Sequence, residues 1–171
     1  MVNSLITDGN CRFNLGKGII DSTVSHEFRG YTTNYSNFMF GTSTSGYDYF
    51  WQGGGMLVWG KAICSVSNTD ITVVVDAKNN KISYNNKNIN TSANFVSDKQ
   101  TCIFDVGRSD SEKSFRPAAS GSKFYRWIMK KDGEIIHDYR PALDVYFNPC
   151  IVDLITNDVF YNVLEGNLTW E

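Results

Sequence analysis

The chain has 171 residues, the size of one ordinary domain, and 42% of them are apolar, enough for a sizeable core. Its 16 basic and 18 acidic residues give a formal net charge of -2, which argues against nucleic-acid binding by bulk electrostatics. No apolar run approaches the roughly 20 residues of a membrane-spanning helix, and the N-terminus lacks the basic and apolar regions of a signal peptide. We therefore expect one domain over residues 1–171, with neither nucleic acid nor membrane as a partner.

The first third of the chain reads as short strands, because no long window shows helical periodicity and the strand signals are frequent and regularly spaced. The three consecutive glycines between Trp51 and Trp59 lack the Lys-Ser/Thr of a phosphate-binding loop, so we interpret them as a hairpin turn. The strands predicted here cover residues 26–31, 38–41, 49–52 and 56–59.

The middle of the chain predicts a meander of two hairpins. Residues 71–76 are largely β-branched, residues 81–84 alternate polar with apolar, and asparagine-rich turns follow both segments. Asparagine adopts positive φ at low cost, so these turns can reverse the chain sharply. Farther on, residues 107–123 carry few strand signals and predict a long surface connection.

The last third repeats the strand and turn pattern. Residues 124–129 have apolar side chains at both odd and even positions, and therefore on both faces of a strand. This pattern predicts a strand that is buried on both faces. A turn at residues 131–133 leads to a strand at 134–139, which we expect Arg140-Pro141 to end because proline cannot donate to a ladder. Residues 150–155 and 159–161 form a final hairpin. At least ten candidate strands at spacings of about ten residues predict an all-β fold, a two-sheet antiparallel β-sandwich of the jelly-roll type.

The cysteines predict buried free thiols. Cys11, Cys64, Cys102 and Cys150 are widely spaced, form no CxxC pair and stand beside apolar or β-forming residues. With only two histidines in the chain, a zinc site is not predicted.

Candidates for catalysis are weak, so we predict that the protein is not an enzyme. No glutamate has another glutamate at the i, i+2 or i, i+4 spacing of a glycosidase pair on one strand, and Asp110 with Glu112 lies in the loop-like stretch. His26 and His137 fall within predicted strands, where a packed or surface role is more common than general-base catalysis. No catalytic residue and no cofactor is predicted.

Calcium has only a weak signal. Asp76 with Asn79, and residues 109–112, are oxygen-rich turns, but neither matches an EF-hand loop.

Two clusters suggest binding instead. Tyr47, Tyr49, Trp51 and Trp59 flank glycine-rich turns and are candidates for stacking on a sugar ring, although burial in the core explains aromatic residues at least as well. Residues 123–131 interleave basic and aromatic residues as single-strand nucleic-acid binders do, but the net charge disfavours that interpretation.

Four segments, in order, resemble concanavalin A-like and laminin-G-like domains of phage and gut-bacterial proteins. ITDGNCRFNLGKGI at residues 6–19 is similar to the opening of such domains, and FMFG at 38–41 resembles their F-F-G strand. FYRWIMKKDGEIIHDYRPA at 124–142 is the most similar block, and VDLITNDVFY at 152–161 resembles their closing strands.

The resemblance implies a lectin-like jelly roll more firmly than an activity. Such domains occur on phage virions and bacterial surfaces, where they bind glycans or pack as structural modules. Because no signal, anchor or partner domain is visible, we expect a virion protein made in the host cytoplasm: a capsid decoration, fibre or tail component. Its expected partners are other virion proteins, with a homo-oligomer or a glycan as further alternatives. An adhesin that recognises surface or mucus glycans is the alternative function.

Overall fold

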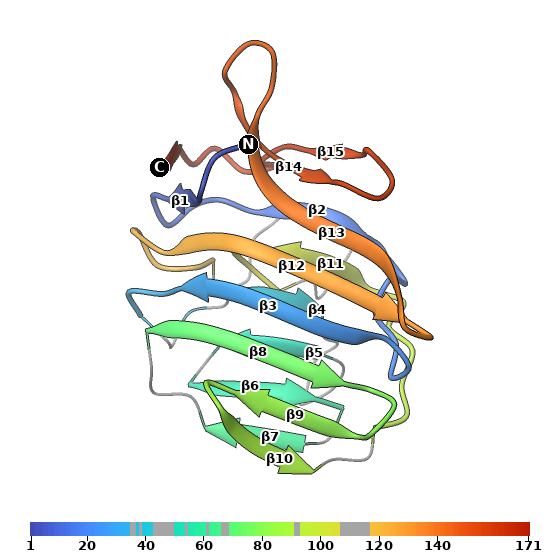
Figure 1. Ribbon diagram of the computed structural model, residues 1–171. Coiled ribbons are helices and arrows are strands. Elements are labelled where there is room, and N and C mark those ends of the chain that lie inside the picture. The colour runs from blue at the N-terminus through green and yellow to red at the C-terminus, as the bar shows by residue number, and fades with distance from the viewer. Residues whose placement is uncertain are drawn as a thin grey trace.

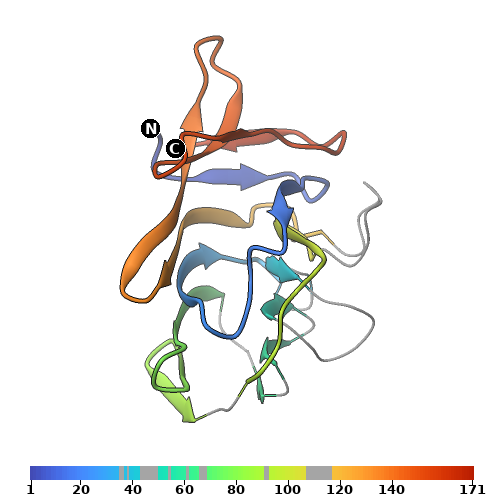
Figure 2. The same cartoon turned by 90° about the vertical axis from the view of Figure 1, so that its right-hand side faces the viewer.

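The computed structural model describes residues 1–34, 37, 39–42, 50–53, 55–60, 62–65, 69–90, 93–106 and 117–171. Within these ranges it contains no helix, and two antiparallel sheets pack as layers (Figures 1 and 2). The predicted all-β sandwich is therefore confirmed. No helix in the described ranges is long and apolar enough to cross a membrane.

The larger sheet forms the front layer of Figure 1. Its strands, in spatial order, are β10 (Lys87–Asn90), β9 (Lys81–Tyr84), β8 (Asp70–Asp76), β3 (Ser25–Tyr31), β12 (Lys123–Lys131), β13 (Glu134–Leu143), β14 (Pro149–Asp153) and β15 (Val159–Phe160). The short strand β1 (Leu5–Thr7) connects one end of β12 to β16 (Leu168–Trp170). The predicted meander is the β8–β9–β10 edge, and its turns have positive φ at Asn80, Asn85 and Asn86.

The smaller sheet lies behind it. Its order is β2 (Phe13–Lys17), β11 (Gln100–Ile103), β4 (Phe40–Thr42), β5 (Phe50–Gly53), β6 (Met56–Trp59) and β7 (Ala62–Ser65). The glycine-rich turn joins β5 to β6 as predicted, since Gly53 pairs with Met56. Alternation places the inward side chains of both sheets in one aromatic core. Its largest buried members include Phe13, Phe28, Phe40, Phe50, Phe104, Phe124, Trp59, Trp127 and Tyr139.

Two strand predictions need correction. The strand after residue 134 does not end at Pro141 but continues to Leu143, with Pro141 paired to Ile151 on β14. The carbonyl oxygen of Pro141 accepts a hydrogen bond from the backbone N–H of Val2 at 3.3 Å, so this residue's polar edge faces away from β14. Since a strand residue directs N–H and C=O to the same side, the ring nitrogen removes no bond from the β13–β14 ladder.

The second correction concerns β12, which was expected to be buried on both faces. Phe124, Trp127 and Met129 are buried in the core, but the other face of the strand lies on the outside of the sandwich and carries Arg126 and Lys130. Arg126 and Lys130 are partly exposed on this face, while Ile128 between them is buried.

The described thiols agree with the sequence prediction. Cys11, Cys102 and Cys150 are free and buried. Burial raises the pKa of Cys11 to about 11 and that of Cys102 to about 12, so both stay protonated at neutral pH. The side chain of Cys64 lies outside the described residues.

Candidate functional site

The four aromatic residues proposed for sugar stacking do not form an exposed platform in the described part of the chain. Trp59 is 1% exposed and packs edge-on against Phe50, with the two ring centroids 5.2 Å apart. Trp51 is 2% exposed and belongs to a small cluster with Val58 and Val106. A sugar cannot stack on a buried indole face, so these two rings serve packing. Tyr47 and Tyr49 lie outside the described residues.

A different group of residues converges on the outer face of the larger sheet, where β12 has a bulge. The register between β12 and β3 shifts between Phe124 and Arg126. Phe124 and Trp127 both point into the core. Between them, Tyr125 and Arg126 are both partly exposed on the outer side. A bulge commonly redirects a side chain in this way and is frequent beside functional sites.

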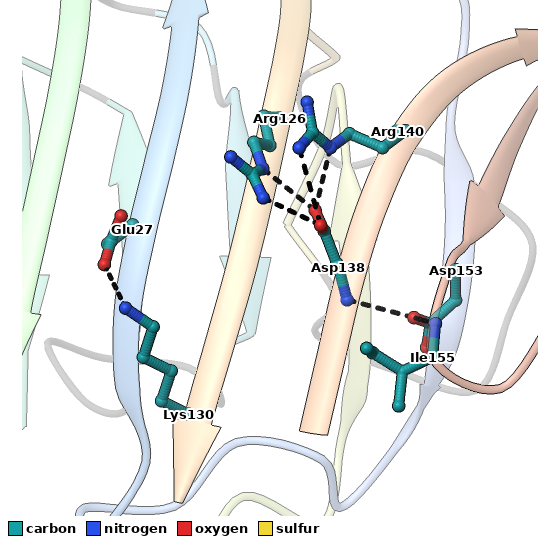
Figure 3. A network of polar contacts seen from close by, with 7 residues as sticks. All are labelled: Glu27, Arg126, Lys130, Asp138, Arg140, Asp153 and Ile155. Atoms are coloured by element: carbon teal, nitrogen blue, oxygen red, sulfur yellow. Dashed lines mark hydrogen bonds and ion pairs between the residues drawn. The ribbon is translucent and has the colours of Figure 1, made fainter. Parts of the chain in front are cut away.

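Arg126 is held by a carboxylate of the neighbouring strand. Its Nε and Nη2 donate to the two oxygens of Asp138 at 2.9 and 2.7 Å (Figure 3). Arg140 donates to the same carboxylate through Nε at 2.9 Å. Burial raises the pKa of Asp138, but the hydrogen bonds and positive charges of the two arginines outweigh that effect and the pKa is lowered. One ionised carboxylate therefore lies between two guanidinium groups.

A third arginine lies beside this pair. Arg29 on β3 occupies the position paired with Arg126. Like charges on directly paired strand positions repel, and Asp138 offsets part of that repulsion here because it pairs with Arg126. Arg29 is exposed, and no ion pair of its side chain is found among the described residues. The three arginines line one open depression of about 260 Å³; its other lining residues are Asn3, Glu27, Tyr125 and Ile128.

One further ion pair borders the depression. Lys130 donates to Glu27 at 2.6 Å, and both side chains remain partly exposed (Figure 3). Glu27 is thus the carboxylate at the wall of the depression, and it is already engaged by a cation from β12.

The histidine beside this network, His137 on β13, is hydrogen-bonded to the carboxylate of Asp153 at the end of β14. Nδ1 of His137 lies 2.6 Å from a carboxylate oxygen of Asp153. That carboxylate also accepts hydrogen bonds from the backbone N–H groups of Asp138 and Ile155 and from the hydroxyl of Thr156. The Thr156 hydroxyl therefore bonds to the carboxylate, and among the described residues no hydroxyl or thiol is hydrogen-bonded to the His137 ring as a nucleophile would be. Asp153 stabilises the turn that follows β14.

The candidate calcium turns show local hydrogen bonding. The carboxylate of Asp76 accepts hydrogen bonds from the backbone N–H of Asn79 at 3.1 Å and from its side-chain amide at 2.7 Å, as in a capped turn. Residues 109–112 lie outside the described residues. In the ranges that the structure describes, no three His, Cys, Asp or Glu side chains gather as a metal site would require.

A larger depression, of about 450 Å³, lies where three turns meet at one end of the larger sheet. Ser22, Thr23, Ser25, Ala77, Lys78, Asp132 and Gly133 line it. Its hydroxyls are partly used within the fold, since Ser25 Oγ accepts from the N–H of Ala77 and the Thr23 hydroxyl donates to Asp21. Lys78 and Asp132 contribute opposite charges, so this depression has no charge preference.

The second prominent surface feature is an apolar hairpin tip. The β13–β14 hairpin extends beyond the body of the sandwich (Figures 1 and 2). At its end Val145, Tyr146 and Phe147 are 85, 80 and 74% exposed. Three consecutive exposed apolar residues are unusual on a soluble protein and commonly mark an interaction surface.

The tip is ordered by one carboxylate. Asp144 accepts hydrogen bonds from the backbone N–H groups of Tyr146 and Asn148 at 2.8 and 2.9 Å. It also accepts from the side chain of Asn148 at 3.0 Å and from the hydroxyl of Tyr161 at 3.2 Å. A loop held in this way presents its apolar side chains in one conformation, which lowers the entropic cost of binding.

The comparisons with known proteins give no relative from which a role can be transferred. No protein-family model matches the chain, and neither the curated proteins nor the solved structures include a match.

Sequence reasoning missed both features, for different reasons. Arg29 and Arg126 are 97 positions apart in the chain, and no local pattern predicts that they pair. The sequence does contain a signal for the tip. The turn-forming residues Asp144 and Asn148 flank three apolar residues, which indicates a turn with apolar side chains at its end.

Proposed function

We propose that the protein is a non-enzymatic structural component of a bacteriophage particle, attached to another virion protein through the tip at residues 144–148. The resemblance to lectin-like domains of phage proteins supports the bacteriophage setting. The exposure of Val145, Tyr146 and Phe147 on a carboxylate-ordered loop is the observation that carries the attachment.

The apolar character of the same end of the molecule supports this proposal. Beyond the tip, the segments following β14 expose several more apolar side chains. They are Leu154, Ile155, Val159, Tyr161, Val163 and Trp170. Together with the tip, they give this end of the molecule apolar side chains that a binding partner could cover.

Quantitative mass spectrometry of density-purified particles tests the proposal. We expect the protein at a fixed copy number relative to the major capsid protein, through successive gradients and high-salt washes. Its absence from washed particles would refute the structural role.

Glycan recognition is the second candidate function, and the depression lined by Arg29, Arg126 and Arg140 favours it. That depression is open, polar and shaped by a bulge, as a site for a hydrated ligand should be. A glycan array probed with the purified protein tests this function. Reproducible binding to a defined group of glycans supports it, and a blank array argues against it.

A further inference from the structure

The depression on the outer face has more positive charge than its own carboxylates can neutralise. Three arginines and one glutamate line it. Glu27 is engaged by Lys130, and Asp138 is shared between Arg126 and Arg140. These six groups carry four positive and two negative charges, so the arginines outnumber the carboxylates that pair with them.

The arginines also keep donors available. A guanidinium carries five N–H donors in a planar fork that matches an oxyanion. Arg126 uses Nε and Nη2 for Asp138, which leaves Nη1 for a ligand. Arg29, in the position paired with Arg126, has no ion pair among the described residues. An oxyanion between these two side chains would relieve their mutual repulsion and receive charge-assisted hydrogen bonds from both.

The remaining lining groups indicate what the oxyanion is attached to. Asn3 offers an amide and Tyr125 a phenol, both of which hydrogen-bond to hydroxyl groups. Glu27 is an acceptor that repels a bare phosphate or sulfate but accepts hydrogen bonds from sugar hydroxyls. Nucleic acid fits poorly, because the net charge of the chain is -2 and a strand of phosphates needs a continuous basic track.

We infer that this depression binds an acidic sugar unit, with its carboxylate or sulfate group held between Arg29 and Arg126 and its hydroxyls directed to Asn3, Tyr125 and Glu27. The inference rests on glycan recognition, the second of the two functions proposed above, and names its ligand class and site. It does not depend on attachment through the tip.

Titrations followed by NMR chemical shifts test the inference with four probes. Glucuronate carries a carboxylate, galactose 6-sulfate carries a sulfate, glucose is the neutral control, and sodium sulfate is the oxyanion without a sugar. The variant Arg29→Met removes the cation that has no ion pair within the described ranges, and it leaves the partners of Asp138 in place. Lys87→Met, on the exposed edge strand β10, is the matched control for loss of one surface charge.

We expect one or both acidic sugars to bind, with an affinity at least tenfold above that of glucose and weakened by added salt. Arg29→Met is expected to lower that affinity about tenfold or more, and Lys87→Met to leave it within about twofold. The inference would be overturned if neither acidic sugar bound more tightly than glucose, and also if Arg29→Met left acidic-sugar binding unchanged. If Arg29→Met leaves acidic-sugar binding unchanged, glycan recognition would still be supported by the array, but this depression would not be the binding site. Binding of sodium sulfate without either acidic sugar would show an adventitious ion only and would overturn the assignment of a sugar.

Discussion

Arg126 on β12 donates two hydrogen bonds to the carboxylate of Asp138 on β13, at 2.9 and 2.7 Å, and Arg140 donates to the same group. Replacing Asp138 by asparagine leaves two partly buried guanidinium groups without their counterion. We expect Asp138→Asn to lower the free energy of unfolding by about 1–2 kcal/mol at neutral pH, a value reduced by the partial exposure of both arginines.

The pH dependence of the Asp138 effect follows from its lowered pKa. A carboxyl group whose pKa is lower in the folded state stabilises the fold above its ordinary pKa of 3.8 and loses that contribution as the pH falls through the folded value. Urea denaturation should therefore show a larger difference between wild type and Asp138→Asn at about pH 7 than at about pH 3. A difference that does not change with pH would contradict the ionic role.

His26 gives a second test, of the same sign but at higher pH. Its ring is buried beside Phe50, with ring centroids 4.6 Å apart, and its Nδ1 accepts a hydrogen bond from Trp127 Nε1 at 3.3 Å. Burial lowers the pKa of His26 to about 3, so the folded protein holds the neutral form. The unfolded chain takes up the proton near the ordinary value of 6.5.

Stability carried by His26 is therefore present above about pH 6.5 and is lost as the pH falls toward 3. Between about pH 7.5 and about pH 5, the free energy of unfolding should fall by about 2 kcal/mol through this residue. His26→Phe should remove that part of the pH dependence, even if the variant is less stable at every pH. If urea denaturation gives the same slope for both proteins, His26 is not the group responsible.

Gly41 should tolerate no side chain. Its φ is 128°, and a Cβ placed there would overlap the carbonyl oxygen of Phe50 and the Cα of Trp51 on the neighbouring strand β5. Since both are backbone or core atoms that cannot move cheaply, Gly41→Ala is expected to cost about 3 kcal/mol or more. Gly133→Ala is the control, because Gly133 has φ of 88° but open space around it. Its expected cost is about 1 kcal/mol. Similar melting temperatures for the two variants would contradict the crowding at Gly41.

Asp144 is expected to control the order of the tip and not the stability of the sandwich. Asp144→Ala removes the acceptor for the N–H groups of Tyr146 and Asn148, so ¹⁵N relaxation should show increased motion at residues 145–148. Particle attachment should weaken while the melting temperature changes little. Asp76→Ala, which opens a similarly capped turn at Asn79, is the matched control and should leave attachment unchanged. Full attachment by Asp144→Ala would show that the tip need not be ordered.

Strands and turns were predictable because their signals are local. Residues 56–59 and 81–84 are strands with the predicted bounds, and the predicted turns contain Asn80, Asp132 and Asn157 at positive φ. Side-chain alternation and the low cost of positive φ at asparagine and aspartate act within a few residues. The prediction that the strand ends at Pro141 was wrong. Whether the proline nitrogen points toward a paired strand depends on which strands lie beside β13, and the local sequence does not contain that information.

The candidate site was not predictable because it depends on register. The pairing of Arg29 with Arg126 arises from one bulge in β12, and a shift of one residue would place a different side chain there. The burial of the two tryptophans was not predictable from the local sequence either. An aromatic residue beside a turn has the same local sequence whether it is buried or exposed, and both are buried here: Trp59 in the main core and Trp51 in a small cluster on the other face of its sheet.

Photo-crosslinking from the tip within purified particles tests the proposed structural role most directly. A photoreactive amino acid at Tyr146 is compared with one at Asn86, an exposed turn residue at the opposite end of the larger sheet (Figure 1). We predict that the probe at position 146 joins the protein to one other virion protein at a defined peptide, and that the probe at position 86 does not. Equal crosslinking from both positions, or none from position 146 in particles that contain the protein, would contradict attachment through the tip.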